Sequence, residues 1–252
     1  MPHPDPIRPA PPPEMGEEGT LAQRAYRLVR ERVLKGVYPP GAALSRRRLA
    51  DEFGMSLLPV AEALQKLVND GLLESRPRVG TRVRMLRRDE VRDRYMLREA
   101  LESQSARLFA ERAKARDKAE ILRMAQRLDG LYEESAGREG DRDFRLSVRQ
   151  FHVRFHLRVA EIAGSPLLRQ AIEREQDLLF SWLSDTAALV HPLPARYHAE
   201  LAEALCSGDV GRADEAIRRH IRYALDELLK FSEEPNGTRW RMAPRRLESP
   251  TF

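Results

Sequence analysis

The sequence predicts a mainly α-helical protein of two units: three short helices with a β-hairpin, followed by an all-α antiparallel helical bundle. Leu, Ala, Arg and Glu dominate the 252 residues and aromatic residues make up only 6%, a composition typical of helical proteins. Apolar residues recur at helical spacing over most of the chain. The main exception is residues 71–85, where two β-like runs flank a basic turn, and this pattern predicts a hairpin.

Both ends of the chain are expected to be disordered. Residues 1–19 are rich in proline and lack the apolar core of a signal peptide, and residues 234–252 lose all apolar periodicity. No window approaches eighteen unbroken apolar residues, so no membrane partner is expected. The single cysteine, Cys206, excludes an internal disulfide and fits a cytoplasmic protein.

The first unit, residues 20–86, begins with three helices whose ends are marked by specific residues. Two prolines and two glycines in residues 36–41 end the first helix. Ser45 is a candidate N-cap for the second helix and Gly54 ends it, while Ser56 precedes the third and Pro59 fits its first turn. The predicted helices are 21–35, 45–53 and 56–70.

This first unit is also basic, with thirteen Lys and Arg against six Asp and Glu in residues 20–86. A compact basic surface favours an anionic polymer as partner, although a merely solvated basic surface remains the alternative. Three helices and a hairpin describe a winged helix-turn-helix, in which the third helix enters a DNA major groove about 12 Å wide. Arg46, Arg47, Arg48 and Lys66 can then reach phosphates. Arg76 and Arg78 at the hairpin tip can approach the minor groove, where Gly80 allows close contact.

Residues 44–83, LSRRRLADEFGMSLLPVAEALQKLVNDGLLESRPRVGTRV, resemble the winged helix of GntR-type bacterial transcription regulators. The resemblance implies binding to a double-stranded DNA operator. Leu57 and Ala61 stand where that family usually has DNA-contacting arginines, and Arg47 replaces a usual acidic residue. We therefore expect a different operator, with loss of DNA binding as the alternative. The expected DNA-binding residues are Arg46, Arg47, Arg48, Ser56, Lys66, Arg76, Arg78 and Gly80.

The second unit, residues 89–233, consists of long amphipathic helices. Short segments rich in glycine, proline or polar residues, such as 136–143 and 191–194, separate them. The predicted helices are 89–114, 117–136, 142–164, 166–189, 195–207 and 210–233.

Four histidines fall on the apolar faces of these helices. His152 and His156 are four residues apart, so they share one face of a helix, which is a spacing that metal sites use. Packing of both rings in an apolar core is the alternative. His198 and His220 lie among apolar neighbours in later helices. Four imidazoles inside one bundle would be costly without a shared cation or hydrogen-bonding partners.

The segments 97–112, 155–168 and 197–221 resemble the ligand-binding domain of FadR-type GntR regulators, called the FCD domain. The resemblance implies a homodimer and a divalent metal held by His156, His198 and His220, while His152 occupies the position of the family's aspartate. Four imidazoles favour Zn²⁺, Ni²⁺ or Cu²⁺. The missing negative charge could come from a small anionic effector, with Arg98 and, less strongly, Glu102 beside it. A surface or interhelix salt bridge is the alternative role of Arg98.

A metal-dependent helical-bundle enzyme is the alternative function. Di-iron bundles need Glu-x-x-His pairs, and metalloproteases need His-Glu-x-x-His; the sequence contains neither pattern. The sequence therefore predicts a transcriptional regulator that is not an enzyme.

Overall fold

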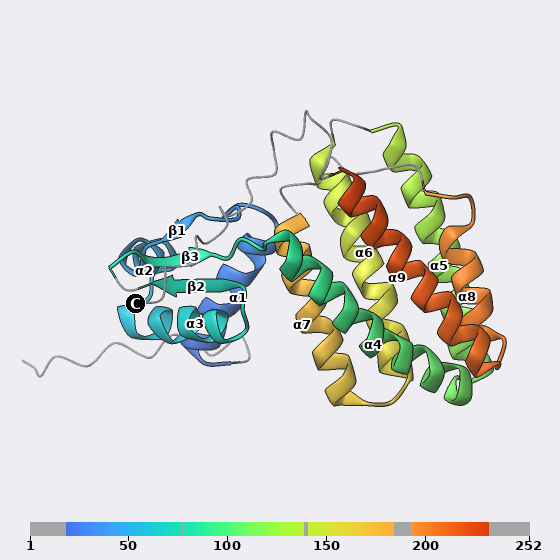
Figure 1. Ribbon diagram of the computed structural model, residues 1–252. Coiled ribbons are helices and arrows are strands. Elements are labelled where there is room, and N and C mark those ends of the chain that lie inside the picture. Colours follow the sequence, from blue (N-terminus) through green and yellow to red (C-terminus); the bar gives the residue numbers. More distant parts are fainter. Residues whose placement is uncertain (1–18, 77, 139–140, 184–192, 232–252) are drawn as a thin grey trace, which may run out of the picture.

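The computed structural model describes residues 19–76, 78–138, 141–183 and 193–231. The predicted tails lie almost wholly outside these ranges. The described chain is mainly helical and has the two predicted units, with the small one on the left of Figure 1 and the helical bundle on the right. None of the helices in these ranges combines the length and apolarity needed to cross a lipid bilayer.

The first unit contains α1 (Leu21–Leu34), α2 (Arg46–Phe53) and α3 (Leu57–Asn69). Thr20 caps α1, since its hydroxyl accepts from the backbone of Gln23 and the Gln23 side chain accepts from the backbone of Thr20. Ser45 caps α2 as predicted, and Gly54 ends it with a left-handed φ of 62°. Ser56 occupies the N-cap position of α3, but its side chain makes no capping hydrogen bond there.

A three-stranded antiparallel sheet, in the order β1-β3-β2, completes this unit. The predicted hairpin is β2 (Leu73–Arg76) and β3 (Gly80–Val83), in which Leu73 lies opposite Val83 and Arg76 opposite Gly80. The additional strand β1 (Ala43–Leu44) was not predicted, because two residues are too short to show an alternating pattern. Leu44, Leu73 and Val83 turn their buried side chains into the core beneath the helices.

The bundle has six helices in the described residues: α4 (Arg88–Arg112), α5 (Ala115–Ala136), α6 (Arg142–Ile162), α7 (Pro166–Leu183), α8 (Tyr197–Cys206) and α9 (Val210–Phe231). The boundaries follow the prediction to within a few residues, except that α7 ends at Leu183. The rest of its predicted range, 184–189, lies outside the described residues. The fully buried side chains at the centre of the bundle include Phe109, Phe155, Ile121 and Leu205.

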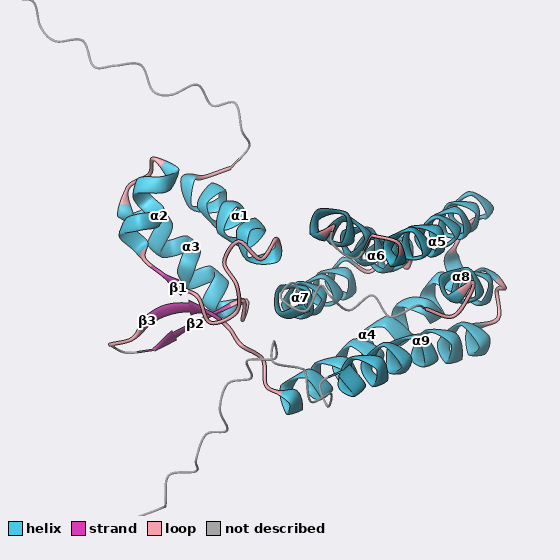
Figure 2. Cartoon of the chain, turned by 90° about the horizontal axis from the view of Figure 1, so that it is seen from above, coloured by secondary structure: helices cyan, strands magenta, loops and turns pink. Residues whose placement is uncertain are grey.

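Helix α7 joins the two units. It lies between α1 and the other bundle helices, as the two views together show (Figures 1 and 2). Leu178 of α7 is 4% exposed and packs in the core of the first unit rather than in that of the bundle. Arg30 of α1 forms a two-pronged ion pair with Asp177, at 2.8 Å from Nε to Oδ2 and 2.6 Å from Nη2 to Oδ1. Arg174 donates to the backbone carbonyl of Asn69. The contact between the units therefore runs largely through three residues of α7: Arg174, Asp177 and Leu178.

Candidate functional site

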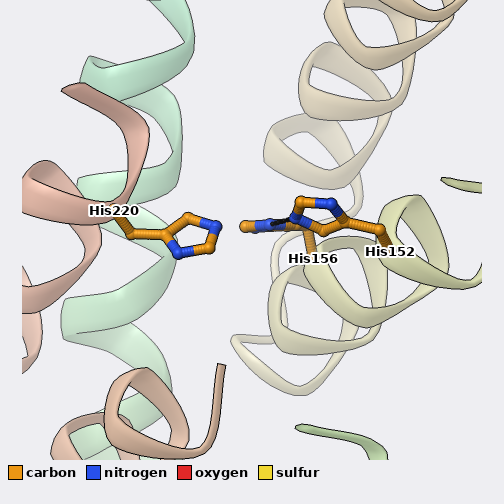
Figure 3. A group of neighbouring side chains, drawn as sticks. All are labelled: His152, His156 and His220. Atoms are coloured by element: carbon orange, nitrogen blue, oxygen red, sulfur yellow. Dashed lines mark hydrogen bonds between the residues drawn. The ribbon is translucent and has the colours of Figure 1, made fainter. Parts of the chain in front are cut away.

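Three histidine side chains from two helices point toward one another inside the bundle (Figure 3). His152 and His156 come from α6 and His220 from α9, and one candidate ligand atom of each lies within 4.8 Å of the other two. Phe155, which is fully buried, anchors the inner face of α6 beside His156. Ile217 and Ile221 flank His220 and are also buried. The helical spacing of these apolar residues therefore turns the imidazoles inward.

His198 of α8 lies beside this group of three. Its ring centroid is 4.9 Å from that of His152 and 5.4 Å from that of His220, and its side chain is fully buried. Its Nδ1 lies 2.7 Å from Oδ1 of Asp129 on α5. The four predicted rings thus meet in one place, although the group of mutually close ligand atoms in the described residues has only three members.

Asp129 also caps a helix of which it is not part. Its carboxylate accepts hydrogen bonds from the backbone N–H groups of His198 and Ala199, at 2.9 and 3.0 Å, in the first turn of α8. The N-cap residue Arg196 has a left-handed φ of 60° and supplies no side-chain cap. Asp129 therefore satisfies two otherwise unpaired N–H groups and sets the orientation of the His198 ring at the same time.

Replacing Asp129 by alanine is expected to lower the free energy of unfolding by about 1–3 kcal/mol, since it removes two helix-capping bonds and leaves the buried Nδ1 of His198 without its partner. Urea unfolding followed by circular dichroism measures this loss. Glu133→Ala, which changes an exposed acid one turn further along α5, is the matched control and should stay within about 0.5 kcal/mol of the native protein. Equal stability of the two variants would contradict the capping role.

Two more histidines are held through their Nδ1 atoms. Nδ1 of His156 lies 2.6 Å from Oε2 of Glu102, and Nδ1 of His152 lies 2.9 Å from the hydroxyl of Tyr132. With Nδ1 occupied by these partners, Nε2 is the atom that faces the centre, and the Nε2 atoms of His152 and His156 lie 2.8 Å apart. A neutral imidazole that donates through one nitrogen and ligates through the other is the usual arrangement in metal sites.

The remaining nitrogens support the fit of a metal ion. Nε2 of His198 and both ring nitrogens of His220 are buried and have no hydrogen-bond partner among the described residues. A buried polar atom without a partner is costly. Burial lowers the pKa of His152 and of His220 well below the usual value, and burial also lowers the pKa of His198 although Asp129 opposes this. These three imidazoles are therefore neutral near pH 7, as coordination of Zn²⁺ or Ni²⁺ requires.

Arg98 does not present an unpaired charge to the site. Its Nε donates to Oε1 of Glu102 at 2.5 Å, one turn along α4, and both side chains are buried. This is a salt bridge, the alternative considered for Arg98, although it lies within one helix and in the interior. Gln176 of α7 also donates to Oε1 of Glu102, at 3.0 Å.

Glu102 is the carboxylate that contacts both Arg98 and His156. Burial by itself would raise its pKa, but the charge of Arg98 and the contact with His156 outweigh burial and hold the pKa at about 2. Glu102 is therefore ionised at all ordinary pH values. Together with Asp129 it places two carboxylates directly behind the imidazoles, in a site where His152 stands at the expected aspartate position.

A second group of candidate residues surrounds the α2–α3 region and the sheet. Arg46, Arg47 and Arg48 are exposed in the first turn of α2. At the tip of the hairpin, Arg78 is exposed and has a left-handed φ of 63°, which is uncommon for a residue with a side chain.

The remaining predicted DNA-binding residues lie on α3 and in the hairpin. Ser56 is exposed at the start of α3, whereas Lys66 in its last turn has its ammonium group 4.7 Å from the centre of the Tyr26 ring. Arg76 pairs with Glu74 at 3.2 Å. Gly80 has a φ of 91°, and a Cβ added there would meet no atom within 4 Å. Backbone could therefore approach a partner closely at this point.

Three residues of the histidine site were not predicted from the sequence: Asp129, Tyr132 and Gln176. Tyr132 carried a weak signal, since it falls at helical spacing from the buried Ala125 and Leu128 on α5. Asp129 and Gln176 carried none, because their partners are about seventy residues distant in the sequence.

Comparison with known families gives two matches that divide the chain as the structure does. Residues 21–83 match the family described as "Bacterial regulatory proteins, gntR family", and residues 93–223 match the FCD domain. The second match alone spans more than half of the chain.

The similar proteins with known names are transcription regulators of the same kind. The "Probable D-xylose utilization operon transcriptional repressor" of Paenarthrobacter nicotinovorans is 30% identical over 80% of this chain and 86% of its own length. The "HTH-type transcriptional repressor GlaR" of Escherichia coli (strain K12) is 27% identical over 78% of this chain and 90% of its own length. Among solved structures, E. coli McbR/YncC has a TM-score of 0.68 at 23% identity, covering 85% of this chain and 99% of that chain, and so shares the fold.

These relatives are named transcriptional repressors, and this confirms the expectation that the protein is not an enzyme. The winged helix and the helical bundle are the two domains that the matches describe. The chain belongs to the GntR family of bacterial transcription regulators, in the branch that carries an FCD domain.

Proposed function

We propose that the protein is a cytoplasmic, homodimeric regulator that binds a pseudo-palindromic operator and changes its DNA affinity when its bundle binds a divalent transition metal and a small anionic effector. The observation that carries this proposal is the connection between the two candidate sites. The helix that contacts the histidine site through Gln176 also packs into the winged helix through Leu178.

Charge at the start of α2 supports DNA binding. Arg46, Arg47 and Arg48 occupy the first turn, where the helix dipole already places a partial positive charge. Three cations at this end destabilise the isolated helix, whereas a phosphate group there would interact favourably with both the arginines and the N-terminal N–H groups. The unfavourable placement is therefore consistent with a role in contacting the DNA backbone.

The affinity of the protein for a duplex carrying its own promoter region is expected to fall steeply with salt. Each phosphate contact contributes about 0.9 to the slope of log K against log salt concentration. Changing Arg46, Arg47 and Arg48 together to alanine should reduce that slope by about 0.9 per lost contact and weaken binding to all sequences alike. Fluorescence anisotropy across a salt series measures both quantities.

A triple variant on the bundle tests whether net charge alone explains the effect. Changing Arg116, Arg123 and Arg127, which are exposed on α5, to alanine removes the same charge from the other unit. This variant should keep the native slope. If both triple variants changed the slope equally, the assignment of α2 to the DNA interface would be wrong, and if the native protein bound no duplex at all the proposed function would fail.

His152, His156, His198 and His220 are the residues that would hold the metal. A bound divalent ion supplies a positive charge to which an oxygen of an anionic effector can bind. The neighbouring groups of this chain fix the rings: Glu102 orients His156, Tyr132 orients His152 and Asp129 orients His198. Because these partners occupy Nδ1, the rings present Nε2 to the centre without rearrangement.

Arg98 is the proposed effector-binding cation, although its guanidinium group already forms a salt bridge with Glu102. An effector carboxylate near Arg98 would compete with Glu102 for the guanidinium group. Because Glu102 also bonds to His156 and Gln176, such competition would alter the contacts of α6 and α7 together. This linked set of contacts gives the effector a physical route to the rest of the protein.

The proposed coupling runs through α7. Gln176 contacts Glu102 at the histidine site, while its neighbours Asp177 and Leu178 hold α1 and the winged-helix core. An open pocket of about 470 Å³ lies beside these contacts, lined by residues of both units including Asp70, Arg94 and Arg174. An interface of few contacts beside an open pocket permits the units to change their relative orientation.

A further inference from the structure

Two leucines at the start of α3 are unusually exposed. Leu57 is 56% exposed and Leu58 is 68% exposed, and they follow one another at the N-terminal end of the helix. Ala61, one turn from Leu57, is partly exposed. Apolar side chains placed together on a surface favour a partner that removes them from water.

The direction of these side chains follows from helix geometry. The inner face of α3 consists of Pro59, Val60, Ala63, Leu64 and Leu67, all of them buried. At 100° per residue Leu58 and Gln65 lie directly opposite the middle of that inner face, with Leu57 and Ala61 at one side of them. In a helix-turn-helix this outward face enters the major groove, and its N-terminal residues contact the base edges.

The edges of the base pairs in the major groove offer hydrogen-bond donors and acceptors and one apolar group, the C5 methyl of thymine. Leucine and alanine side chains make no hydrogen bonds, so they cannot discriminate guanine, cytosine or adenine through donors and acceptors. We propose that Leu57, Leu58 and Ala61 are specificity-determining residues that contact thymine methyl groups in the operator. This inference rests on the proposed DNA-binding function and identifies the base that the first turn of α3 reads.

Glu62 and Gln65 are the exposed polar residues that follow the leucines on this face, and of the two Gln65 agrees with a site that contains adenine. Gln65 is exposed two turns after Leu58, and its side-chain amide donates to Asn69 at 3.1 Å. Gln and Asn amides match the adjacent acceptor and donor on the major-groove edge of adenine. Lys66, the one basic residue of α3, is stacked on Tyr26 in the last turn, so the first turn has no cation with which to read guanine. The predicted half-site therefore contains thymine where the first turn of α3 contacts it.

The experiment begins with selection of duplexes from a random-sequence library by the full-length protein. Each thymine of the recovered sequence is then replaced singly by uracil, which removes the C5 methyl group and leaves every hydrogen bond unchanged. At one or more positions in each half-site, affinity at fixed salt should fall about fourfold, the order of magnitude expected for burying one carbon of an apolar group. The protein should also bind a duplex with 5-methylcytosine·G at such a position more tightly than a duplex with C·G there.

A double-mutant comparison ties the methyl group to the side chains. In the Leu57→Ala, Leu58→Ala variant, the thymine-to-uracil penalty should disappear at the affected positions while salt-dependent binding to random duplex persists. Leu167→Ala is the matched control, since Leu167 is a 78% exposed leucine at the start of α7 in the bundle, and it should keep the native penalty. Unchanged thermal unfolding of both variants confirms that they fold.

The outcomes separate this inference from the function on which it rests. Selective binding with no uracil penalty at any position would overturn the thymine assignment and leave the DNA-binding function intact. Failure to recover any preferred duplex, together with no salt-dependent binding, would overturn the function itself. A Leu57→Ala, Leu58→Ala variant that changed its oligomeric state, with no change in the uracil penalty, would assign the leucines to a contact between copies of the chain and contradict the proposal.

Discussion

Zinc is expected to raise the free energy of unfolding of the native protein by about 4 kcal/mol when free zinc is about 1,000-fold above its dissociation constant. The reason is that the native bundle brings one ring nitrogen from each of three imidazoles to within 4.8 Å of one another and keeps a fourth imidazole beside them, whereas the unfolded chain does not. The gain should vanish in His156→Ala and in His220→Ala. Urea unfolding in zinc buffer and in chelator, with elemental analysis of protein purified without added metal, measures the effect.

The two variants differ in a useful way. His156→Ala leaves Glu102 bonded to Arg98 and Gln176 but without its imidazole. His220→Ala removes a ring whose nitrogens have no protein partner among the described residues. Without metal, the free energy of unfolding should therefore fall by different amounts in the two variants. Zinc should stabilise neither of them. Comparing each variant with and without zinc removes the packing contribution from the result.

Two controls make the prediction specific. His152→Asp restores a carboxylate at the position where the resemblance places one, and should still bind metal, because Asp is also a ligand for divalent transition metals. Changing His3 and His191 together to alanine removes the two histidines of the sequence that are not among the four proposed ligands, and should leave the response to zinc intact. Zinc stabilisation that survived in His156→Ala and His220→Ala would show that the ion binds elsewhere.

The grouping of the four histidines could be predicted from the sequence, but the orientation of their rings could not. His152 and His156 are four residues apart on a helix with a clear apolar face, and this spacing is a local property of the chain. The Nδ1 contacts that turn Nε2 inward come instead from Asp129, Tyr132 and Glu102, which belong to α5 and α4. Only the packing of separate helices determines such contacts.

Arg98 illustrates the same limit. The resemblance to the FCD domain implied that Arg98 places a cation near the site, and Arg98 does lie near it. Whether it faces a ligand or a protein carboxylate depends on Glu102 one turn away, and the same carboxylate also accepts from Gln176 and contacts His156. A spacing of four residues between Arg and Glu is common on exposed helix faces, so the sequence alone does not distinguish a surface pair from this buried one.

The fold was predictable where local signals were strong. The capping residue Ser45 and the helix-ending Gly54 lie where the sequence places them, since caps and left-handed turns depend on neighbouring residues. The position of Leu178 was not predictable. The periodicity of α7 shows an apolar face but does not say that one residue of it completes the core of the winged helix.

Changing Gln176 to leucine is expected to separate metal binding from DNA binding. Leucine has a similar volume but cannot donate to Glu102, so the link between α7 and the histidine site is lost while Arg30–Asp177 and the packing of Leu178 remain. The variant should bind zinc and DNA. The ratio of its DNA affinities with zinc and with chelator, expected to be about 5- to 150-fold in the native protein, should approach one.

The position of Gln176 explains why a single side chain can have this effect. Linkage requires that both sites bias one element with two arrangements. In α7 the residues that contact the two sites are adjacent, so a shift of the helix that follows Glu102 must also move Asp177 and Leu178 against the winged helix. Without the Gln176 bond, α7 no longer has a hydrogen bond to the carboxylate that holds His156.

Anisotropy titrations of one duplex at fixed salt, with zinc or with chelator, give the ratio for each protein. Glu173→Gln is the matched control, because Glu173 pairs with Arg169 of its own helix and so should keep the native ratio. If Gln176→Leu also kept the native ratio, the coupling would have to pass through other contacts between the units, of which the Arg84–Glu90 pair at the entrance to α4 is the next candidate. If the native protein bound DNA equally well in zinc and in chelator, the ion would stabilise the bundle without changing the affinity for DNA.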